Sequence, residues 1–360
     1  MIYMRVKLGD VCERGSSNLK QSDVAENNGD YEIYGASGLI GKVDFFHQDK
    51  PYIAVVKDGA GIGRTMLLPE KSSVIGTMQY LLPNEKVLPR YLYYVVRYMH
   101  LEKYFTGATI PHIYFKDYKN EEFNLCDLSE QEKIISSLST IESIITHHRT
   151  QLEKLDELIK ARFVEMFGDP IDNPMRWQVK PMKELSVLIT NGNTPKGGSE
   201  NYVYSGIIFL RSQNVWRNRI DLSDVAYIDD VTHQKMRKSS VKHKDILITK
   251  TGRINTENSS LGRAALYLGE DDSANINGHV YLVRLNDAVV PEFVVTILTG
   301  EAYRKYIRKV CVGGIDKRQI NLDQVEDFPI ILPPIEQQRA FADFSNQVDK
   351  SKFIEKEVSQ

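Results

Sequence analysis

The chain contains one segment twice. Residues 107–125 are matched by residues 314–332 at a constant offset of 207, with glycine and apolar residues at the same places. A Glu-Gln pair follows each copy, at Glu130-Gln131 and at Glu336-Gln337, and aligning these pairs requires a one-residue loop difference that changes the offset to 206. Such a duplication predicts two globular units of one fold, related by a pseudo-twofold internal repeat. We expect these units to do one job at two places.

Earlier segments of the two copies also correspond. Residues 89–92 resemble residues 291–294. The stretch from Lys57 to Arg64 resembles the longer stretch from Lys250 to Arg263. The duplication therefore involves most of each unit.

Composition fits two globular domains and a connector. At 360 residues, with 42% hydrophobic and 26% charged residues, the chain is too long for one ordinary core. It has no apolar run of the ~18 to 20 residues that a membrane helix needs and no N-terminal signal pattern, so we expect a cytoplasmic protein with no membrane partner. The cysteines Cys12, Cys126 and Cys311 are far apart, which predicts reduced thiols. The net charge of −2 does not by itself indicate a nucleic-acid binder.

Short β-rich runs between Gly, Asn, Asp and Pro residues fill both copies. The clearest predicted strands are residues 52–56, 79–82, 122–125, 206–210, 245–249 and 280–283. Each copy also has one predicted helix, at residues 89–104 and 291–309, and both begin with a proline, which the first turn of a helix tolerates. These elements predict an α+β fold with two β-rich domains, at residues 1–128 and 171–334.

A long helix is predicted in the connector, residues 129–170. Ser129 with Glu132 matches a capping box, and Gly168 followed by Pro170 ends the helix. Apolar residues recur between them at alternating steps of about four and three, as in a heptad seam: Ile134, Leu138, Ile141, Ile145, Leu152, Leu155 and Ile159. A helix over residues 129–166 is roughly 57 Å long at ~1.5 Å per residue, so it needs a partner helix, within the chain or outside it.

The last residues, 335–360, repeat the start of the connector in a shorter form. Phe344 and Val348 belong to the apolar set of this second helix.

These features, in this order, resemble the DNA-specificity subunit of type I restriction-modification systems. The resemblance covers essentially the whole chain. It is carried by the two Glu-Gln joints, by residues 163–170 followed by Trp177, by residues 192–195, and by residues 34–38 and 57–60 of the first copy.

The resemblance implies a non-catalytic subunit with two target-recognition domains, each of which reads one half of an asymmetric, bipartite site on double-stranded DNA. Two conserved helical regions would pair as an antiparallel coiled coil. The pairing residues would be the heptad residues of the connector together with Phe344 and Val348 of the second helix. The paired helices would dock two methyltransferase subunits. In the family those subunits methylate adenine at N6 with S-adenosylmethionine, and a restriction subunit that uses ATP and Mg²⁺ can join. No cofactor is therefore expected in this chain.

Residue types suited to DNA occur in loops of both domains, since base edges need donors and acceptors and phosphates need cations. Candidates in the first domain are Lys57, Arg64, Thr65, His112, Tyr114 and Lys116. In the second domain, phosphate candidates are Lys242, Lys317 and Arg318, and base candidates are Arg211, Gln213, Asn214, Lys250, Arg253, Asn255 and Gln319. A charged run is equally typical of a solvated face.

Other readings of the sequence have less support. The glycine run at residues 59–63 is interpreted as a turn, because a strand pattern follows it where a dinucleotide site needs a helix. No nucleotide-binding loop, metalloprotease motif or Ser-His-Asp pattern is present, so neither catalytic nor metal-binding residues are predicted. The alternative function is a coiled-coil scaffold with two repeated protein-binding domains that do not bind DNA.

Overall fold

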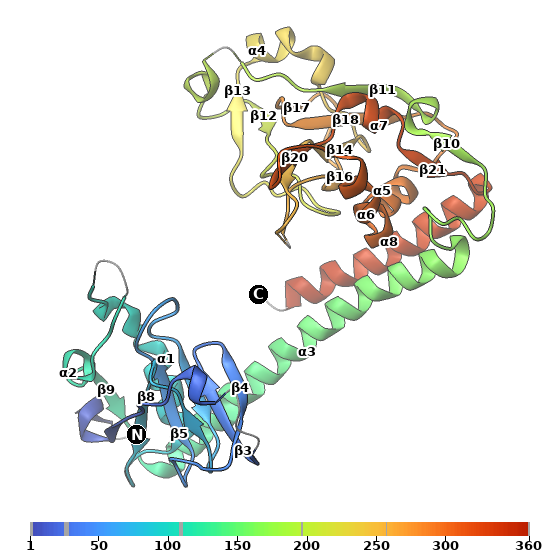
Figure 1. The fold of residues 1–360 in the computed structure, drawn as a ribbon. Helices are drawn as coiled ribbons and strands as arrows, with labels where there is room; N and C mark the ends of the chain where they lie inside the picture. The colour runs from blue at the N-terminus through green and yellow to red at the C-terminus, as the bar shows by residue number, and fades with distance from the viewer. Residues whose placement is uncertain (1–2, 25–28, 108–110, 196, 257, 359–360) are drawn as a thin grey trace. The chain divides into compact units, whose positions relative to one another are not determined.

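The computed structural model describes residues 3–24, 29–107, 111–195, 197–256 and 258–358, with side chains up to residue 352. The chain forms two compact units, residues 1–147 (unit 1) and 148–360 (unit 2). The long helix α3, Leu128–Phe167, contributes its first half to unit 1 and its second half to unit 2 (Figure 1). Each unit combines helices with small sheets, as an α+β fold requires.

The described residues of unit 1 form nine short strands and a few helices. Its strands are β1 Met4–Lys7, β2 Cys12–Ser16, β3 Tyr31–Gly35, β4 Gly38–Val43, β5 Tyr52–Val56, β6 Thr65–Leu68, β7 Ser73–Val74, β8 Met78–Pro83 and β9 Glu122–Leu125. Its helices before α3 are α1 Pro89–Tyr98 and α2 Phe115–Tyr118, with 3-10 turns at Leu8–Asp10, Gln21–Asp23 and Leu101–Tyr104.

Unit 2 has the same kinds of elements and, among its described residues, three more strands than unit 1. Its strands are β10 Val179–Pro181, β11 Ser186–Asn191, β12 Ile207–Leu210, β13 Ala226–Ile228, β14 Ile246–Thr249, β15 Thr251–Arg253, β16 Ala264–Leu266, β17 Ala274–Ile276, β18 Val280–Leu285, β19 Val312–Gly313, β20 Lys317–Gln319 and β21 Pro329–Ile331. Its helices are α4 Asp230–Lys235, α5 Pro291–Thr299, α6 Glu301–Val310, α7 Leu322–Glu326 and α8 Ile335–Val358, with 3-10 turns at Met182–Leu185, Gly198–Asn201 and Arg237–Ser239.

The sheet topology confirms the repeat. Unit 1 has a four-stranded antiparallel sheet in the order β2-β8-β5-β6 and a mixed sheet in the order β4-β3-β7, and unit 2 has β11-β18-β14-β16 and β13-β12-β17 in the same roles. In both mixed sheets the central strand is antiparallel to one neighbour and parallel to the other. A two-stranded pair, β1-β9 or β10-β21, connects each unit to the helix that follows it.

The four-stranded sheet is the central layer of each unit. All five residues of β5 are buried, and successive side chains point to opposite faces. Ile53 and Val55 lie in the apolar cluster that includes α1, while Tyr52 and Ala54 lie in a second cluster on the other face. A strand covered on both faces reads as a continuous apolar run, which is why residues 52–56 were predictable to the residue.

Corresponding backbone hydrogen bonds extend the repeat into the loops. Val56 N–H donates to Arg64 and Gly63 N–H donates to Val56, both at 2.9 Å, and in unit 2 Thr249 and Arg263 take the same places as Val56 and Arg64. Gly63 and Gly262 have φ of +80° and +66°, which favour glycine because other residues are strained there. The glycine run before Gly63 is thus the turn between antiparallel β5 and β6, as predicted.

The domain helices are shorter than predicted. The predicted helix at residues 89–104 ends at Tyr98 and is followed by a separate 3-10 turn. The predicted helix at residues 291–309 is two helices, because Gly300 has an extended backbone with ψ of 153° between α5 and α6. The apolar pattern runs across both breaks, so it did not reveal them.

The capping box predicted at Ser129 is wrong. Helix α3 begins at Leu128, and the Asp127 side chain caps it by accepting a hydrogen bond from Glu130 N–H at 2.9 Å. Gly168 ends the helix with a φ of +75°, as predicted.

A buried glutamine fixes the start of each long helix. Gln131 Nε2 donates to the Cys126 carbonyl at 2.9 Å, and Gln131 Oε1 accepts from Leu88 N–H at 2.8 Å at the start of α1. In unit 2, Gln338 Nε2 donates to the Pro333 carbonyl at 2.8 Å, and its Oε1 accepts from Val290 N–H at 3.0 Å at the start of α5. Both glutamines are fully buried.

This correspondence corrects the predicted alignment of the joints. Gln131 is equivalent to Gln338, whereas Gln337 is exposed, so the offset stays at 207 and there is no one-residue loop difference. The starts of α3 and α8, Leu128 and Ile335, keep the same offset. The alignment of the two Glu-Gln pairs had matched Gln131 with Gln337, whereas its structural counterpart is Gln338.

The end of α3 is part of the core of unit 2. The Phe163 ring lies 5.6 Å from Phe293 of α5 and 5.4 Å from Phe341 of α8, and Phe167 contacts the same two rings. Aromatic pairs of this kind contribute about 0.5–1.5 kcal/mol each beyond area burial. These four rings hold three helices together.

Contacts between α3 and α8 show that these helices are antiparallel within unit 2. Phe341, early in α8, packs on Phe163, while Lys352, late in α8, pairs with Asp156 at 2.6 Å. Of the predicted seam residues there, Val348 is buried, and Leu152, Leu155, Ile159 and Phe344 are half-buried. In Figure 1, α8 runs beside the last turns of α3.

Within unit 1 the seam residues lie differently from the prediction. Ile134 packs on the core cluster of unit 1 and not on a partner helix. Leu138 is half-buried beside α1, whereas Ile141 and Ile145 are 51% and 42% exposed. The heptad pattern correctly marked the apolar side of α3, although different elements cover different parts of it.

We predict that Gln338→Ala destabilises unit 2 by about 1–3 kcal/mol, because Val290 N–H and the Pro333 carbonyl lose a buried partner. Both tryptophans, Trp177 and Trp216, lie in unit 2, so tryptophan fluorescence during urea unfolding reports on this unit alone. Gln337→Ala, at the exposed neighbouring position, is the matched control and should change stability by less than about 0.5 kcal/mol. Equal effects of the two changes would contradict the assignment of Gln338.

Candidate nucleic-acid interface

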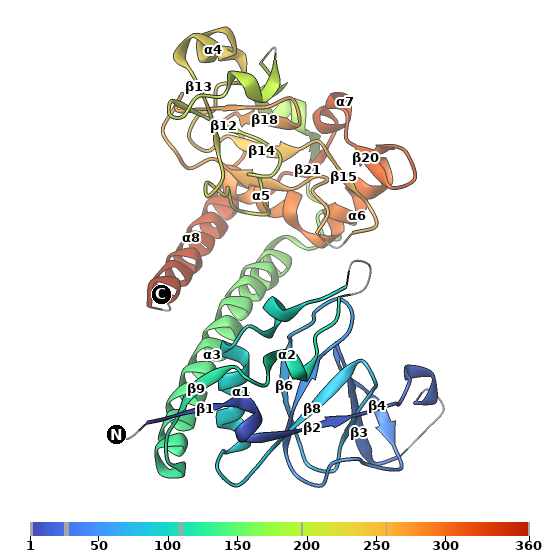
Figure 2. The same cartoon turned by 90° about the vertical axis from the view of Figure 1, so that its left-hand side faces the viewer.

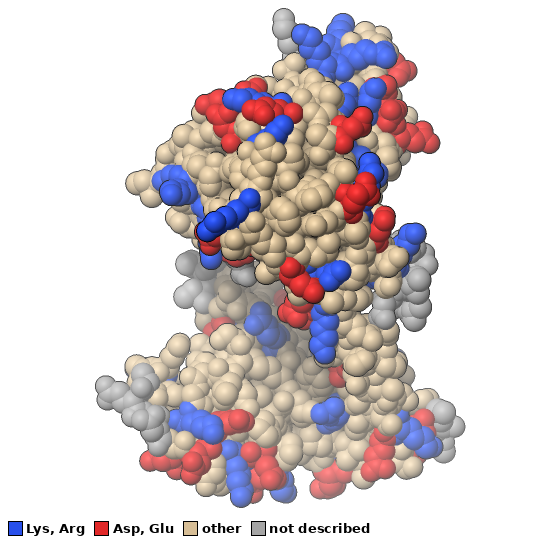
Figure 3. Space-filling view, turned by 90° about the vertical axis from the view of Figure 1, so that its right-hand side faces the viewer, with Lys and Arg blue, Asp and Glu red and all other residues tan. Residues whose placement is uncertain are grey.

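Charged side chains do not separate into large areas of one sign on the face shown in Figure 3, where blue and red groups are intermixed on each unit. This agrees with the net charge of −2. A surface for an anionic partner therefore has to come from local clusters of charged and polar side chains.

Four of the six candidates in unit 1 form one cluster. His112 Nδ1 lies 2.6 Å from Asp58 Oδ1, and Lys57 Nζ lies 4.0 Å from the other oxygen of that carboxylate. The His112 ring stacks on the half-exposed ring of Tyr114, and Lys116 Nζ lies 5.3 Å from the centre of the Tyr114 ring. The cluster combines two cations, an imidazole and an aromatic face, which are groups that can contact phosphates and bases.

The other two candidates of unit 1 lie on the turn between β5 and β6. Arg64 is exposed and its Nη1 donates to the Ala36 carbonyl at 2.9 Å. The Thr65 hydroxyl donates to the Gly63 carbonyl at 3.1 Å, so its proton is already used in the turn. Arg64 therefore has further N–H groups that can donate to DNA, while the Thr65 hydroxyl oxygen can mainly accept hydrogen bonds.

In unit 2 the small sheet β15-β20-β19 brings five candidates together. Thr251 pairs with Gln319 and Arg253 pairs with Lys317 across β15 and β20, and Lys250 directly precedes β15. Arg253 Nε lies 3.3 Å from Asp316, in the turn between β19 and β20. The members of this cluster are Lys250, Arg253, Lys317, Arg318 and Gln319.

The two clusters occupy the same place in the repeated fold. Ile113 N–H donates to the Lys57 carbonyl, and Ile320 N–H donates to the Lys250 carbonyl, both at 2.9 Å. His112 and Gln319, which precede these isoleucines, are therefore counterparts. The fold thus places a lysine beside a hydrogen-bonding side chain in both units. That side chain is the imidazole of His112 in unit 1 and the amide of Gln319 in unit 2.

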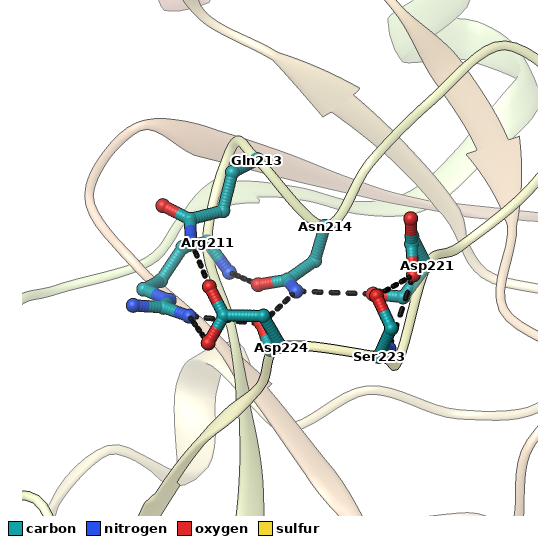
Figure 4. A network of polar contacts seen from close by, with 6 residues as sticks. All are labelled: Arg211, Gln213, Asn214, Asp221, Ser223 and Asp224. Carbon is teal, nitrogen blue, oxygen red and sulfur yellow. Dashed lines mark hydrogen bonds and ion pairs between the residues drawn. The ribbon is translucent and has the colours of Figure 1, made fainter. Parts of the chain in front are cut away.

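A third group of candidates, Arg211, Gln213 and Asn214, lies in the loop after β12 (Figure 4). Arg211 Nη2 and Gln213 Nε2 both reach Asp224, at 3.4 Å and 2.8 Å from its carboxylate oxygens. Arg211 and Gln213 are at least partly accessible, so both stay candidates.

Asn214 has a different role from the one predicted. Its side chain is 2% exposed, accepts a hydrogen bond from Arg211 N–H at 2.9 Å, and donates to the carbonyls of Asp221 and Asp224. Figure 4 shows these bonds closing the loop from inside. A side chain that is buried and bonded in this way holds the loop and is not accessible to DNA.

The last two candidates are exposed. Asn255 lies in the loop that follows β15, close to Arg253 at the end of that strand. Lys242 precedes β14, at the opposite end of that strand from Lys250, so the structure does not bring it to the β15-β20-β19 cluster.

The prediction missed a set of arginines around Trp216. Arg263 and Arg219 lie over the indole, with guanidinium carbons 4.0 Å and 5.3 Å from the ring centre. One signal in the sequence was the correspondence of Arg263 with Arg64 in the repeat.

Unit 1 also has an apolar groove of about 1250 Å³ beside the first half of α3. Tyr94 of α1 donates to Glu142 of α3 at 2.8 Å and closes one side of the groove. Its apolar lining includes Tyr91, Tyr94, Tyr98, Phe123, Leu138 and Ile141. Such a surface is suited to a protein partner more than to DNA, because tyrosines and aliphatic side chains are typical of interface cores.

Comparison with known proteins gives the family. Residues 3–157 and residues 174–360 each match the model of the type I restriction modification DNA specificity domain. The chain belongs to this specificity-domain family. The two matched segments are the two copies of the repeat, so the specificity domain is present twice.

Curated relatives of this specificity-domain protein are specificity subunits from Methanocaldococcus jannaschii. The putative type I restriction enzyme MjaX specificity subunit is 24% identical over 180 residues, which are 49% of this chain and 41% of the relative. The MjaVIII specificity subunit is 23% identical over 313 residues, 82% of this chain and 72% of the relative. The match therefore spans less than half the length of the first of these relatives.

Solved structures show the same fold. The S subunit of a type I restriction-modification system from M. genitalium superposes with a TM-score of 0.62 over 99% of this chain and 92% of that chain, at 15% identity. A chain from a study of complex assembly and conformational transition in a type I system gives 0.52 over 99% and 93%, also at 15% identity. At this level of identity the likeness establishes the fold of the specificity-domain protein and not its contacts.

No described helix of this specificity-domain protein is long and apolar enough to cross a membrane.

We predict that Asn214→Ala lowers the stability of unit 2 by about 1–3 kcal/mol, because Arg211 N–H and the carbonyls of Asp221 and Asp224 lose a buried partner. Gln213→Ala removes the exposed neighbouring amide and should have a much smaller effect. Urea unfolding followed by tryptophan fluorescence compares the two variants. If Gln213→Ala were the more damaging change, the structural role given to Asn214 would be wrong.

Proposed function

We propose that the chain is the sequence-specific DNA-binding subunit of a type I restriction-modification complex. Each unit contacts one half of an asymmetric, bipartite site on double-stranded DNA, and the helices dock methyltransferase subunits, expected to be two. The chain performs no catalytic step itself. S-adenosylmethionine would be bound by the methyltransferase, and ATP and Mg²⁺ by a restriction subunit if one joins.

The observation that carries this proposal is the equivalence of the two clusters. Lys57 with His112, and Lys250 with Gln319, occupy the same backbone positions in two copies of the specificity domain. The lysine is the same in both units, but His112 stands where unit 2 has Gln319, as expected if each unit contacts a different half-site. A duplicated protein-binding scaffold would not need cations at both places.

The chemistry of the clusters suits a DNA duplex. Lysine and arginine can contact phosphates or the acceptor edge of guanine, and glutamine can pair with adenine. Asp58 and Asp316 hold the neighbouring cations in place in the free chain. A phosphate can replace these carboxylates as the partner, so binding should depend on salt through the release of counterions.

The first half of α3 supports the proposed docking of a methyltransferase subunit. Ile141, Ile144 and Ile145 are each about half exposed at helical spacing, and Ile141 lines the apolar groove. An apolar helix stripe of this kind costs free energy while it faces water, and a partner subunit that covers it recovers that energy.

We predict that Arg253→Gln with Lys317→Gln weakens recognition of one half-site only. The measurement is a genome-wide map of N6-methyladenine in the source organism, made with the natural gene, without the gene, and with the variant. The natural gene should produce one asymmetric, two-part motif that the deletion abolishes, and the variant should lose or relax one half of that motif. Lys57→Gln with His112→Gln is the matched change in unit 1 and should affect the other half.

Deleting residues 177–334 is a poorer test than these substitutions. The deletion removes Phe293 and exposes Phe163, Phe167 and Phe341, which would disrupt the helices as well as the contact surface. Both pairs of substitutions lie at accessible positions and leave the aromatic core intact. An unchanged motif in both variants, or effects of both variants on the same half-site, would contradict the proposal that each unit contacts its own half-site.

We predict that Ile141→Asp reduces copurification of the methyltransferase subunit several-fold while the chain stays folded. The residue is 51% exposed, so its replacement should change stability by less than about 1 kcal/mol, but a buried charge at an interface is costly. Ser143→Asp adds the same charge two residues along the helix, on another face, and should leave copurification unchanged. Equal recovery of methyltransferase with Ile141→Asp would exclude this face as the docking surface.

A further inference from the structure

A small pocket in unit 2 is lined by three arginines. Its volume is about 130 Å³, and its walls are Trp216, Arg217, Arg219, Asn258 and Arg263. None of these residues belongs to the clusters described above, although Asn258 lies in the loop between β15 and β16, which follows Arg253 at the end of β15.

A hairpin turn holds two of the arginines in place. Val215 and Ile220 pair across the turn, and Trp216 N–H donates to the Arg219 carbonyl at 2.9 Å. Asn218 has a φ of +56°, a conformation that asparagine tolerates well. Its N–H donates to the Ala264 carbonyl at 2.9 Å, and its side chain accepts from the Thr299 hydroxyl at 3.1 Å, so the turn is fixed to the body of unit 2.

The third arginine, Arg263, is oriented by its own bonds. It is 8% exposed, and its Nε and Nη2 donate to the carbonyls of Ser259 and Asn258 at 3.1 Å and 2.6 Å. Its guanidinium lies against the face of Trp216, 4.0 Å from the ring centre. Arg64, its counterpart in unit 1, is exposed and bonds to the Ala36 carbonyl, so this arrangement belongs to unit 2.

The charges of the pocket are not balanced. Within the part of the chain that the structure describes, no carboxylate lies within 4.0 Å of Arg217, Arg219 or Arg263 as an ion pair, whereas Arg211 and Arg253 each have an aspartate partner. Arg304 of α6 is near Arg217, and Glu301, the acidic neighbour, pairs with Arg304 at 3.1 Å.

The pKa values of these arginines reflect the same imbalance. Burial lowers the pKa of Arg263, and the charges of Arg217 and Arg219 lower it further. Partial burial also lowers the pKa of Arg217; the charges of Arg304 and Arg308 lower it further, and the charge of Glu301 opposes them. Arginine stays charged even so, and the mutual repulsion is relieved when an anion binds between the guanidinium groups.

We propose that this pocket holds a phosphate group of the DNA backbone. Planar guanidinium groups bind phosphate through paired hydrogen bonds, and three of them converge here in a space suited to a small anion. Arg263 covers one face of Trp216, so that face is not available for stacking with a base. The inference rests on the proposed function and adds to it a site that anchors unit 2 on the duplex without reading sequence.

An anchor of this kind has a specific consequence. A phosphate contact strengthens binding to every sequence to a similar extent and releases condensed counterions. Loss of the pocket should therefore weaken binding uniformly and reduce its dependence on salt, while the order of preference among sequences stays the same.

The test uses the full chain with a fluorescent DNA duplex of mixed sequence, and measures Kd by anisotropy at a series of salt concentrations. The variant is Arg217→Gln with Arg219→Gln, because both side chains are exposed and their loss should not unfold unit 2, which thermal melting verifies. Loss of one phosphate contact should lower the slope of log Kd against log salt by about 0.9 and raise Kd roughly eightfold at ~0.1 M salt.

A matched control separates the pocket from general charge effects. Lys235→Gln with Lys238→Gln removes the same charge at exposed positions in and after α4, which lies at the other end of unit 2 from α6 (Figure 2). Arg217→Lys with Arg219→Lys retains the charge and should retain most of the slope, but should lose affinity because lysine lacks the planar fork.

The outcomes are distinguishable. A larger fall in slope and affinity for the glutamine variant of the pocket than for the control supports the anchor. Equal changes in both, with the natural chain binding normally, overturn the anchor and leave the proposed function intact. If the natural chain binds no DNA, alone or with its methyltransferase, the proposed function and the anchor both fail.

Discussion

The structure depends on one buried amide in each unit. Gln131 and Gln338 are fully enclosed, and an enclosed amide is stable only when its donors and acceptors are all matched. Each glutamine joins three parts of its unit: the end of the last strand, the start of the domain helix and the first turn of the long helix. The direction in which the long helix leaves the domain is therefore set by hydrogen bonds, which are directional, as well as by apolar contacts, which are not.

Much of the fold could be predicted because its strands and helix ends follow from short, local sequence patterns. The strand Tyr52–Val56 is a continuous apolar run, and the end of α3 is marked by Gly168. The break at Gly300 was missed because the apolar spacing continues through it into α6. Ile134 was assigned to a helix pair but packs on its own domain, since a heptad pattern marks an apolar side without identifying what covers it.

The candidate site was only partly predictable, for a different reason. Residue type and the repeat were enough to select Lys57 and Lys250, whose equivalent places are fixed by strand pairing. Burial was not visible in the sequence, so Asn214 was chosen as an amide that could read a base although it closes a loop. The arginines around Trp216 come from segments about 45 residues apart, Arg219 and Arg263 among them, and only the folded chain brings them together.

The four phenylalanines at the end of α3 bear on how such a chain can change during evolution. Phe163 and Phe167 precede the second domain, Phe293 lies within it and Phe341 follows it, yet they form one cluster. A recombination event that replaced the second domain would import a new residue at position 293 between inherited neighbours. A donor with a small side chain there would leave a cavity among the inherited rings and destabilise the product, by about 3–5 kcal/mol if the change is equivalent to Phe→Ala. The cluster thus restricts which second domains can replace the present one, while the loops that carry the contact surface remain free to vary.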